Sequence, residues 1–239
     1  MSKKVLIVDD EKAIVDILNH NLKREGYETL EAYDGEEAIN LVKNENPDLV
    51  LLDVMLPKMD GFSVCKNIRQ VSNIPILMVT AKEDIVDKVI GLELGADDYI
   101  TKPFSVREVM ARVKANLRKW DGIEASRKDA ENSEDGSNQI LEFGALTLDT
   151  FKYDAKVSGK STDITLKEFE LLKFLAVNKG KVFSREELLE NVWGYEYFGD
   201  VRNVDVTIRR IREKIEKDPS APELLLTKRG VGYYFNTNN

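Results

Sequence analysis

Residues 48–61 of the chain are DLVLLDVMLPKMDG, an apolar run between two aspartates followed by a turn rich in proline and glycine. An apolar run of this length, without polar alternation, is typical of a strand that is buried on both faces. Strands of that kind belong to parallel sheets covered by helices. We therefore expect residues 48–53 to form an inner strand of a parallel sheet.

The flanking sequence repeats the same unit, a short apolar strand followed by a helix-spaced segment. Five strands alternating with five helices predict an α/β fold, a doubly wound parallel five-stranded sheet, over residues 1–120. The expected strands are Lys4–Val8, Glu28–Ala32, Asp48–Asp53, Pro75–Val79 and Asp98–Ile100, and the expected helices cover Ile14–Leu22, Gly35–Lys43, Phe62–Gln70, Glu83–Leu94 and Ser105–Arg118.

Residues 121–138 are polar and acidic, and they predict a flexible linker. Residues 139–239 follow a different pattern, that of an α+β domain, with short strands, three helices and a final hairpin. Thr165 with Glu168, and Ser184 with Glu187, form the Ser/Thr-x-x-Glu pattern of a helix N-terminus. The expected strands are Leu141–Phe143, Leu146–Leu148, Tyr153–Val157, Leu224–Thr227 and Tyr233–Asn236, and the last helix is expected at Arg202–Glu216.

Composition excludes several classes of protein. The apolar runs are far shorter than the roughly 20 residues that span a bilayer, and the N-terminus has no signal-peptide pattern, so we expect a cytoplasmic protein without a membrane partner. The single cysteine, Cys65, and the single histidine, His20, exclude a disulfide within the chain and a Cys- or His-rich metal site. The net charge of −8 lies in residues 1–138, while residues 139–239 carry 16 basic and 16 acidic side chains. A neutral domain can still present one basic face.

Acidic residues gather at the ends of the predicted strands. Asp9 and Asp10 follow the first strand and Asp53 ends the third, so all three are expected at the carboxyl edge of the sheet, where open α/β folds bind ligands. Their mutual repulsion and hard oxygen atoms favour a Mg²⁺ ion. Thr80 and Lys102 end the next two strands. A carboxylate nucleophile, a metal, a lysine and a hydroxyl suit phosphoryl transfer.

These residues resemble the receiver domain of bacterial two-component response regulators, which has a CheY-like, flavodoxin-like fold. The resemblance covers residues 1–120 and rests on Val8–Glu11, Leu52–Pro57, Asp60–Gly61, Thr80–Lys82, Gly95–Tyr99 and Thr101–Phe104. It implies that Asp53 accepts a phosphoryl group from a sensor histidine kinase. It also implies Mg²⁺ ligation by Asp10, Asp53 and the Met55 carbonyl, with Asp9 acting through a water. Lys102 and Thr80 would contact the phosphoryl oxygens, Tyr99 would move inward with Thr80, and Lys102–Pro103 would be cis.

The same resemblance implies a homodimer that forms on phosphorylation, through the surface between the fourth and fifth helices. The positions that match the family's charged and apolar dimer contacts are Lys88, Val89, Leu92, Asp97, Asp98, Glu108, Met110, Arg112 and Lys119. From the residues alone, a solvated, charge-rich face is the favoured explanation of this surface.

The helix expected at Arg202–Glu216 has an apolar face and a basic face. Val204, Ile208, Ile211 and Ile215 share one side, while Arg202, Val206, Arg209, Arg210 and Glu213 fall on the other. A helix of this kind fits the major groove of B-DNA, and the basic hairpin tip around Arg229 fits an adjacent minor groove. An ordinary amphipathic helix with solvated arginines is the alternative.

Residues 139–239 also resemble the winged-helix output domain of the OmpR/PhoB class. The resemblance rests on Leu166–Leu172, Ser184–Leu189, Val192–Gly194, Arg202–Lys214 and Arg229–Tyr233. It implies binding to direct repeats in double-stranded promoter DNA and contact with RNA polymerase through Trp193–Gly199. The expected DNA contacts are Arg202, Asn203, Val206, Thr207, Arg209, Arg210, Arg212, Thr227 and Arg229.

Within that class, Val192–Arg202 and Arg229–Tyr234 are similar to the WalR/VicR cell-wall regulators of Gram-positive bacteria, although Asn203 replaces their usual threonine. The sequence thus predicts a phosphorylation-switched transcription regulator that is not an enzyme acting on an external substrate. Two alternatives remain. A Mg²⁺-dependent phosphatase would need a second Asp where Met55 stands. A DNA-binding or scaffold protein independent of phosphorylation is opposed only weakly by the acidic site.

Overall fold

The computed structural model describes residues 2–80, 91–117, 140–194 and 201–237. The chain divides into two compact units, Met1–Leu117 and Arg118–Asn239, and each is described here by itself. The predicted linker at 121–138 lies outside the described residues, so the boundaries at 120 and 139 stay predictions. No helix among the described residues is both long enough and apolar enough to cross a membrane.

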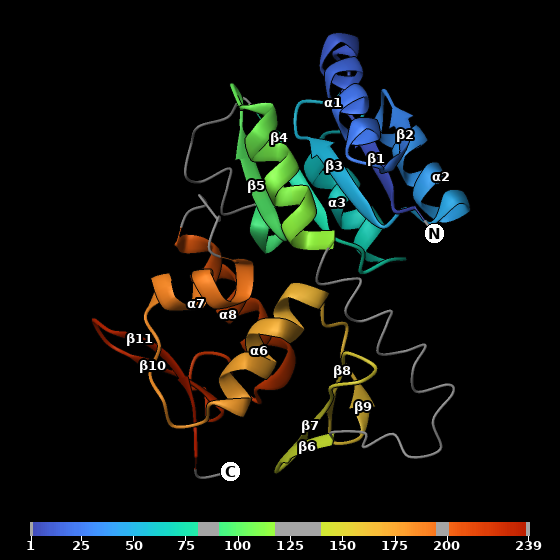
Figure 1. Ribbon diagram of the computed structural model, residues 1–239. Helices are drawn as coiled ribbons and strands as arrows, with labels where there is room; N and C mark the ends of the chain where they lie inside the picture. Colours follow the sequence, from blue (N-terminus) through green and yellow to red (C-terminus); the bar gives the residue numbers. More distant parts are fainter. Residues whose placement is uncertain (1, 81–90, 118–139, 195–200, 238–239) are drawn as a thin grey trace. The chain divides into compact units, whose positions relative to one another are not determined.

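The first unit is the predicted doubly wound fold. Its parallel sheet has the strand order β2-β1-β3-β4-β5, with helices along the strands (Figure 1). The bounds are β1 Lys4–Val8, α1 Lys12–Arg24, β2 Glu28–Ala32, α2 Gly35–Glu45, β3 Leu49–Asp53, α3 Gly61–Arg69, β4 Ile76–Thr80 and β5 Asp98–Thr101. Residues 91–93 and 106–117 are also helical; the rest of the helix predicted at Glu83–Leu94 lies outside the described residues.

The sheet topology brings the first and third strands together, although about 40 residues separate them. In β3 all five residues are buried, as the unbroken apolar run predicted. Val8 of β1 pairs with Leu52 of β3, and Asp53 pairs with Val79 of β4. The residues that follow these strands therefore meet at one carboxyl edge. Thr80 reaches the same edge because it pairs with Thr101 of β5.

The second unit is an α+β fold of the winged-helix type. A four-stranded antiparallel sheet precedes three helices, and a two-stranded hairpin follows them (Figure 1). Trp193, Phe169 and Phe235 are the largest buried side chains of its core. The bounds are β6 Ile140–Phe143, β7 Leu146–Asp149, β8 Asp154–Val157, β9 Lys160–Ser161, α6 Leu166–Val177, α7 Arg185–Trp193, α8 Arg202–Ile215, β10 Leu225–Lys228 and β11 Gly232–Phe235. The two-residue strand β9 was not predicted, because it is too short to show alternation.

Both predicted capping boxes are present. The side chain of Thr165 accepts from the Glu168 amide at the start of α6, and Ser184 accepts from the Glu187 amide at the start of α7. In both, the glutamate reaches back to the backbone of the cap residue. These local signals explain why both helices begin where the sequence predicted.

Replacing Ser184 with alanine is expected to lower the free energy of unfolding of this unit by about 1 kcal/mol, because the Glu187 amide loses its acceptor. Urea denaturation followed by the fluorescence of the buried Trp193, with Trp120 replaced by Phe, measures the change. Replacement of Ser220, whose hydroxyl bonds Asp218 in an exposed turn, is the control and is expected to cost less. Equal losses for the two variants would contradict the role of the cap.

Candidate metal centre and nucleic-acid interface

Three carboxylates converge at the carboxyl edge of the sheet in the first unit. Oxygen atoms of Asp9, Asp10 and Asp53 lie within 4.8 Å of one another. Asp9 and Asp53 are buried, whereas Asp10 is exposed. The sequence predicted this convergence because Asp9 and Asp10 follow one strand and Asp53 ends another, and the sheet topology places these two strands side by side.

Backbone amides and a glycine hold the two buried carboxylates in place. Oδ1 of Asp9 accepts from the amide of Glu11 at 2.9 Å, and Oδ1 of Asp53 accepts from the amide of Met55 at 3.2 Å. Gly61 passes so close to this strand that a Cβ on it would lie 2.1 Å from the carbonyl oxygen of Asp53. Glycine is required there because any side chain would push the loop after β3 away from the site.

Lys102 closes the cluster from β5. Its ammonium lies 2.8 Å from Asp9 and 2.9 Å from Asp53, and it also lies 3.5 Å from the exposed Glu11. Burial raises the pKa of Asp9, and the hydrogen bond from Lys102 opposes that rise. Burial alone would lower the pKa of Lys102, but its hydrogen bonds to Asp9 and Asp53 leave that pKa above its ordinary value. Lys102 is therefore charged at neutral pH.

The donor set suits a Mg²⁺ ion. Asp10 makes no hydrogen bond or ion pair with any described residue, so its carboxylate oxygens are free for a cation. One lysine offsets only part of three negative charges, and the exposed side of the cluster leaves room for the waters that Mg²⁺ retains. Asp10, Asp53 and the Met55 carbonyl are the groups that would hold the ion. Bound there, it would neutralise charge during phosphoryl transfer.

The remaining residues predicted around this site are also positioned near the sheet edge. Thr80 is fully buried at the end of β4, and its carbonyl accepts from the Lys102 amide at 2.6 Å. Tyr99 in β5 is buried, so its ring lies inside the unit. The side chain of Met55 is exposed. The Lys102–Pro103 bond is cis, as predicted.

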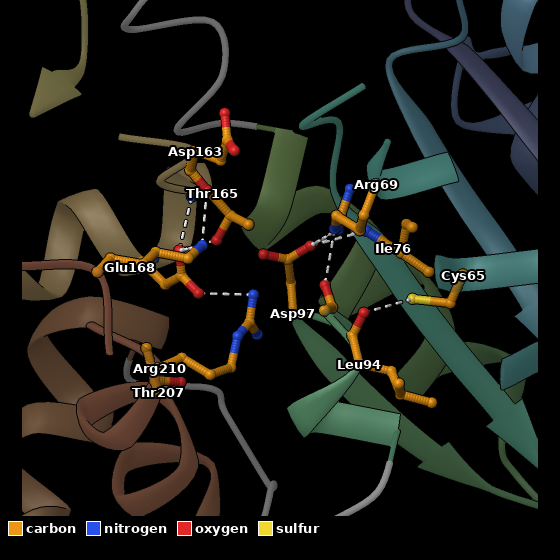
Figure 2. Close-up of polar contacts among 12 residues, drawn as sticks. Cys65, Arg69, Ile76, Leu94, Asp97, Asp163, Thr165, Glu168, Thr207 and Arg210 are labelled. Atoms are coloured by element: carbon orange, nitrogen blue, oxygen red, sulfur yellow. Dashed lines mark hydrogen bonds and ion pairs between the residues drawn. The ribbon is translucent and has the colours of Figure 1, made fainter. Parts of the chain in front are cut away.

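The charged residues predicted for dimerisation that the structure describes form ion pairs within the unit. Arg112 binds both carboxylate oxygens of Asp98, at 2.8 and 2.9 Å, and also contacts Glu108 at 2.8 Å. Asp97 pairs with Arg69 at 2.7 Å and accepts from the Ile76 amide (Figure 2). Leu92 is buried and Met110 half-buried. Lys88, Val89 and Lys119 lie outside the described residues. The dimer role of all nine positions stays a prediction.

In the second unit, α8 has the apolar face that the sequence predicted, with Val204, Ile208, Ile211 and Ile215 buried in the core. Among the predicted DNA contacts, Arg202, Arg209, Thr227 and Arg229 are exposed. Arg209 pairs with its helical neighbour Glu213, at 3.1 Å, and both side chains are at least half exposed. Asn203, Val206, Thr207 and Arg210 are buried, which the helical pattern alone did not indicate.

Two of the predicted DNA-contacting arginines make bonds inside the unit. Arg210 contacts Oε1 of Glu168 at 2.6 Å (Figure 2). Arg212 donates from Nε to the Leu225 carbonyl and from Nη2 to Thr227 Oγ1, both at 2.8 Å. These bonds attach α8 to α6 and to β10. Whether either guanidinium also reaches DNA stays a prediction.

Sequence reasoning missed a cluster around Tyr233. Asp205 Oδ1 accepts from Arg185 Nε at 2.6 Å and from the Tyr233 hydroxyl at 2.7 Å. Burial and, to a smaller extent, the hydrogen bond to Asp205 raise the pKa of Tyr233 to about 12. No local sequence pattern links these residues, because they belong to α7, α8 and β11. The one clue in the sequence is that Asp205 is an acidic residue in the first turn of an otherwise basic helix.

Trp193, which opens the segment predicted to contact RNA polymerase, is buried in the core of the unit. Its ring lies 5.4 Å from the ammonium of Lys167. Residues 195–199 of that segment lie outside the described residues. Packing in the core therefore accounts for Trp193.

Two family models match the chain. The model described as "Response regulator receiver domain" matches residues 5–114, and the one described as "Transcriptional regulatory protein, C terminal" matches residues 159–235. The chain is 35% identical to the response regulator DrrB of Thermotoga maritima, an OmpR/PhoB homolog, over 99% of this chain and 100% of that one, with a TM-score of 0.49. A RitR mutant structure is 26% identical over 98% and 99% of the two chains, with a TM-score of 0.76.

Proposed function

Because the chain belongs to the two-component response regulators of the OmpR/PhoB class, we propose that phosphorylation of Asp53 controls its binding to tandem DNA half-sites. A receiver domain joined to a DNA-binding domain makes the protein a transcription factor rather than an enzyme. Its class implies a histidine kinase as partner and DNA as target. The proposal adds the residue that is phosphorylated and what phosphorylation changes.

The observation that carries the proposal is the position of Lys102 between Asp9 and Asp53, at 2.8 and 2.9 Å. The Asp53 carboxylate attacks the phosphorus of the kinase's phosphohistidine; a P–O bond forms, the P–N bond breaks, and the released imidazole nitrogen takes up a proton. Lys102 and Thr80 bind the phosphoryl oxygens, Asp10 and the Met55 carbonyl help to hold Mg²⁺, and Asp9 acts through a water.

The added group carries about −1.5 to −2 charges and three strong acceptors. Lys102 can bind the phosphoryl group only by leaving Asp9, and Thr80 can reach this group only by moving from its buried position. Tyr99 then fills the space that Thr80 leaves. Because these residues end β4 and β5, their movement shifts the segments that follow. We propose that this promotes a homodimer through the surface between the fourth and fifth helices, with Leu92, Met110 and Arg112 among its residues.

In the second unit, α8 would act as the recognition helix in the major groove. The hairpin β10–β11 would act as the wing, with Arg229 in the adjacent minor groove. Arg202 and Arg209 are the exposed arginines of α8 that support this placement. The segment Trp193–Gly199 would contact RNA polymerase, and the protein would act in the cytoplasm. Its similarity to WalR/VicR regulators in Val192–Arg202 supports cell-wall genes as targets.

Intact mass measured after incubation with Mg²⁺ and acetyl phosphate tests the phosphoacceptor. The wild-type chain is expected to gain one phosphoryl group, and the Asp53→Asn variant is expected to gain none, because its amide cannot act as the nucleophile. EDTA is expected to abolish the gain. A phosphoryl group of the same stoichiometry on Asp53→Asn would refute the assignment. DNA affinity that is equal for wild type and variant, both treated with the phosphodonor, would refute the switch.

A further inference from the structure

We propose that Asp205 is a positioning residue for DNA binding, which acts through Arg185 and Tyr233 to hold the wing against the recognition helix. The inference rests on the proposed function, because it takes α8 and the wing as the two elements that contact neighbouring grooves. Asp205 itself need not touch DNA. Its effect is on the distance and angle between the two elements that do.

The geometry joins three elements at one carboxylate oxygen. Asp205, in the first turn of α8, accepts from Arg185 of α7 at 2.6 Å and from the Tyr233 hydroxyl of β11 at 2.7 Å. Nη2 of Arg185 lies 3.3 Å from the same hydroxyl, and its guanidinium carbon lies 5.1 Å from the centre of the tyrosine ring. Both helices of the helix-turn-helix and one strand of the wing are thereby connected.

Arg212 makes a second connection two helical turns further along α8. It bonds the Leu225 carbonyl and the Thr227 hydroxyl of β10, and its guanidinium carbon lies 5.8 Å from the centre of the Tyr233 ring. The recognition helix is thus attached to the wing near both of its ends. Backbone bonds between Tyr233 and Phe183 also hold β11, so the side-chain attachments act on how the rest of the hairpin lies against α8.

Electrostatics alone would not favour an acid at this place. A carboxylate in a helix that faces DNA repels phosphates. The side chains of the Arg185–Asp205 pair are 32% and 40% exposed, so the pair contributes little to folding. Its benefit is preorganisation. A complex that uses two grooves forms more tightly when the two contacting elements are already held at the right separation.

The test compares Asp205→Ala, which removes the acceptor of both hydrogen bonds, with wild type as full-length, phosphodonor-treated proteins. Two probes are used: a duplex enriched from a random pool by the wild-type protein, and poly(dI-dC) as non-specific DNA. Affinity for the enriched duplex is expected to fall about tenfold, while affinity for poly(dI-dC) does not fall. Simple loss of a negative charge would instead strengthen both. Glu186→Gln, which neutralises an exposed acid next to Arg185, is the matched control and is expected to weaken neither.

A double-mutant cycle with Arg229→Ala separates positioning from a merely structural role. If Asp205 acts through the wing, Arg229→Ala costs several times less affinity in the Asp205→Ala background than in wild type. Tyr233→Phe, which removes only the hydroxyl, is expected to lower the specific affinity in the same direction and to add little to Asp205→Ala.

Three outcomes would overturn the inference. The first is that Arg229→Ala lowers the specific DNA affinity equally in both backgrounds. The second is that the Asp205 variant loses as much affinity for poly(dI-dC) as for the enriched duplex. The third is unchanged specific affinity in Tyr233→Phe. A pool from which the wild-type protein enriches no sequence would instead contradict the proposed function itself, and the inference with it.

Discussion

The Glu168→Ala variant is expected to lose about 3–5 kcal/mol of the free energy of unfolding of the DNA-binding unit. Glu168 is fully buried. Its Oε2 accepts from the Thr165 amide at 2.7 Å and from Lys214 Nζ at 2.6 Å, and its Oε1 contacts Arg210 at 2.6 Å. Truncation leaves a backbone amide and two cations of α8 without their shared acceptor.

The second capping box supplies a matched control for Glu168→Ala. Glu187 has the same place in α7 and bonds the Ser184 amide at 2.7 Å, but this bond is exposed and no described cation pairs with Glu187. Glu187→Ala is therefore expected to cost about 1 kcal/mol or less. Urea denaturation followed by Trp193 fluorescence, with Trp120 replaced by Phe, measures both. Equal losses would mean that Glu168 contributes only as a cap.

The Lys102→Met variant is expected to destabilise the receiver unit by about 2–4 kcal/mol at pH 7 without Mg²⁺, because it leaves two buried carboxylates with no cation between them. Lys102 has a raised pKa in the folded state, so its contribution is complete below its unfolded pKa of 10.5 and is lost as pH rises through the folded pKa. At pH 7 the variant therefore lacks the whole of this contribution.

Acidification is expected to narrow the difference between Lys102→Met and wild type. Burial already raises the pKa of Asp9, so the ionised Asp9 carboxylate destabilises the fold at pH values above its folded pKa. This destabilisation disappears as pH falls from the folded pKa toward the unfolded value of 3.8. Without Lys102, the pKa of Asp9 rises further, so the variant regains more stability on acidification than wild type does. Adding Asp53→Asn to the variant is expected to restore part of the stability at pH 7.

Hydrogen exchange of the β1 and β3 amides, measured by mass spectrometry in EDTA-containing buffer, reports this stability for the receiver unit within the full chain. Lys58→Met is the control. Lys58 also pairs with an aspartate, Asp34, at 2.7 Å, but its side chain is mostly exposed. Little change is expected there because water screens such a pair. A loss in Lys102→Met that has the same size at pH 7 and pH 4 would contradict this explanation.

The sequence by itself determined the features that depend on local patterns. Apolar runs and helical spacing predicted the parallel sheet and its order of elements, and Thr165 and Ser184 predicted where two helices begin. Even the acidic site was predictable, because Asp9 follows one strand and Asp53 and Thr80 end two others, and parallel pairing must bring these strand ends to one edge. Each of these inferences needs only residues that are close in the chain, or a rule that holds for every parallel sheet.

Only the tertiary structure decided which charged side chains form ion pairs and hydrogen bonds within the fold. The sequence placed Arg210 on the basic face of α8 and, through the family resemblance, Arg212 among the DNA contacts. Arg210, however, contacts Glu168, 42 positions earlier, and Arg212 bonds Thr227 of the wing. The meeting of Arg185, Asp205 and Tyr233 spans 48 positions. Arginine and lysine side chains are long and flexible, so the partner that each one reaches depends on which elements pack beside it. That packing comes from the burial of the whole core, and no local sequence pattern records it.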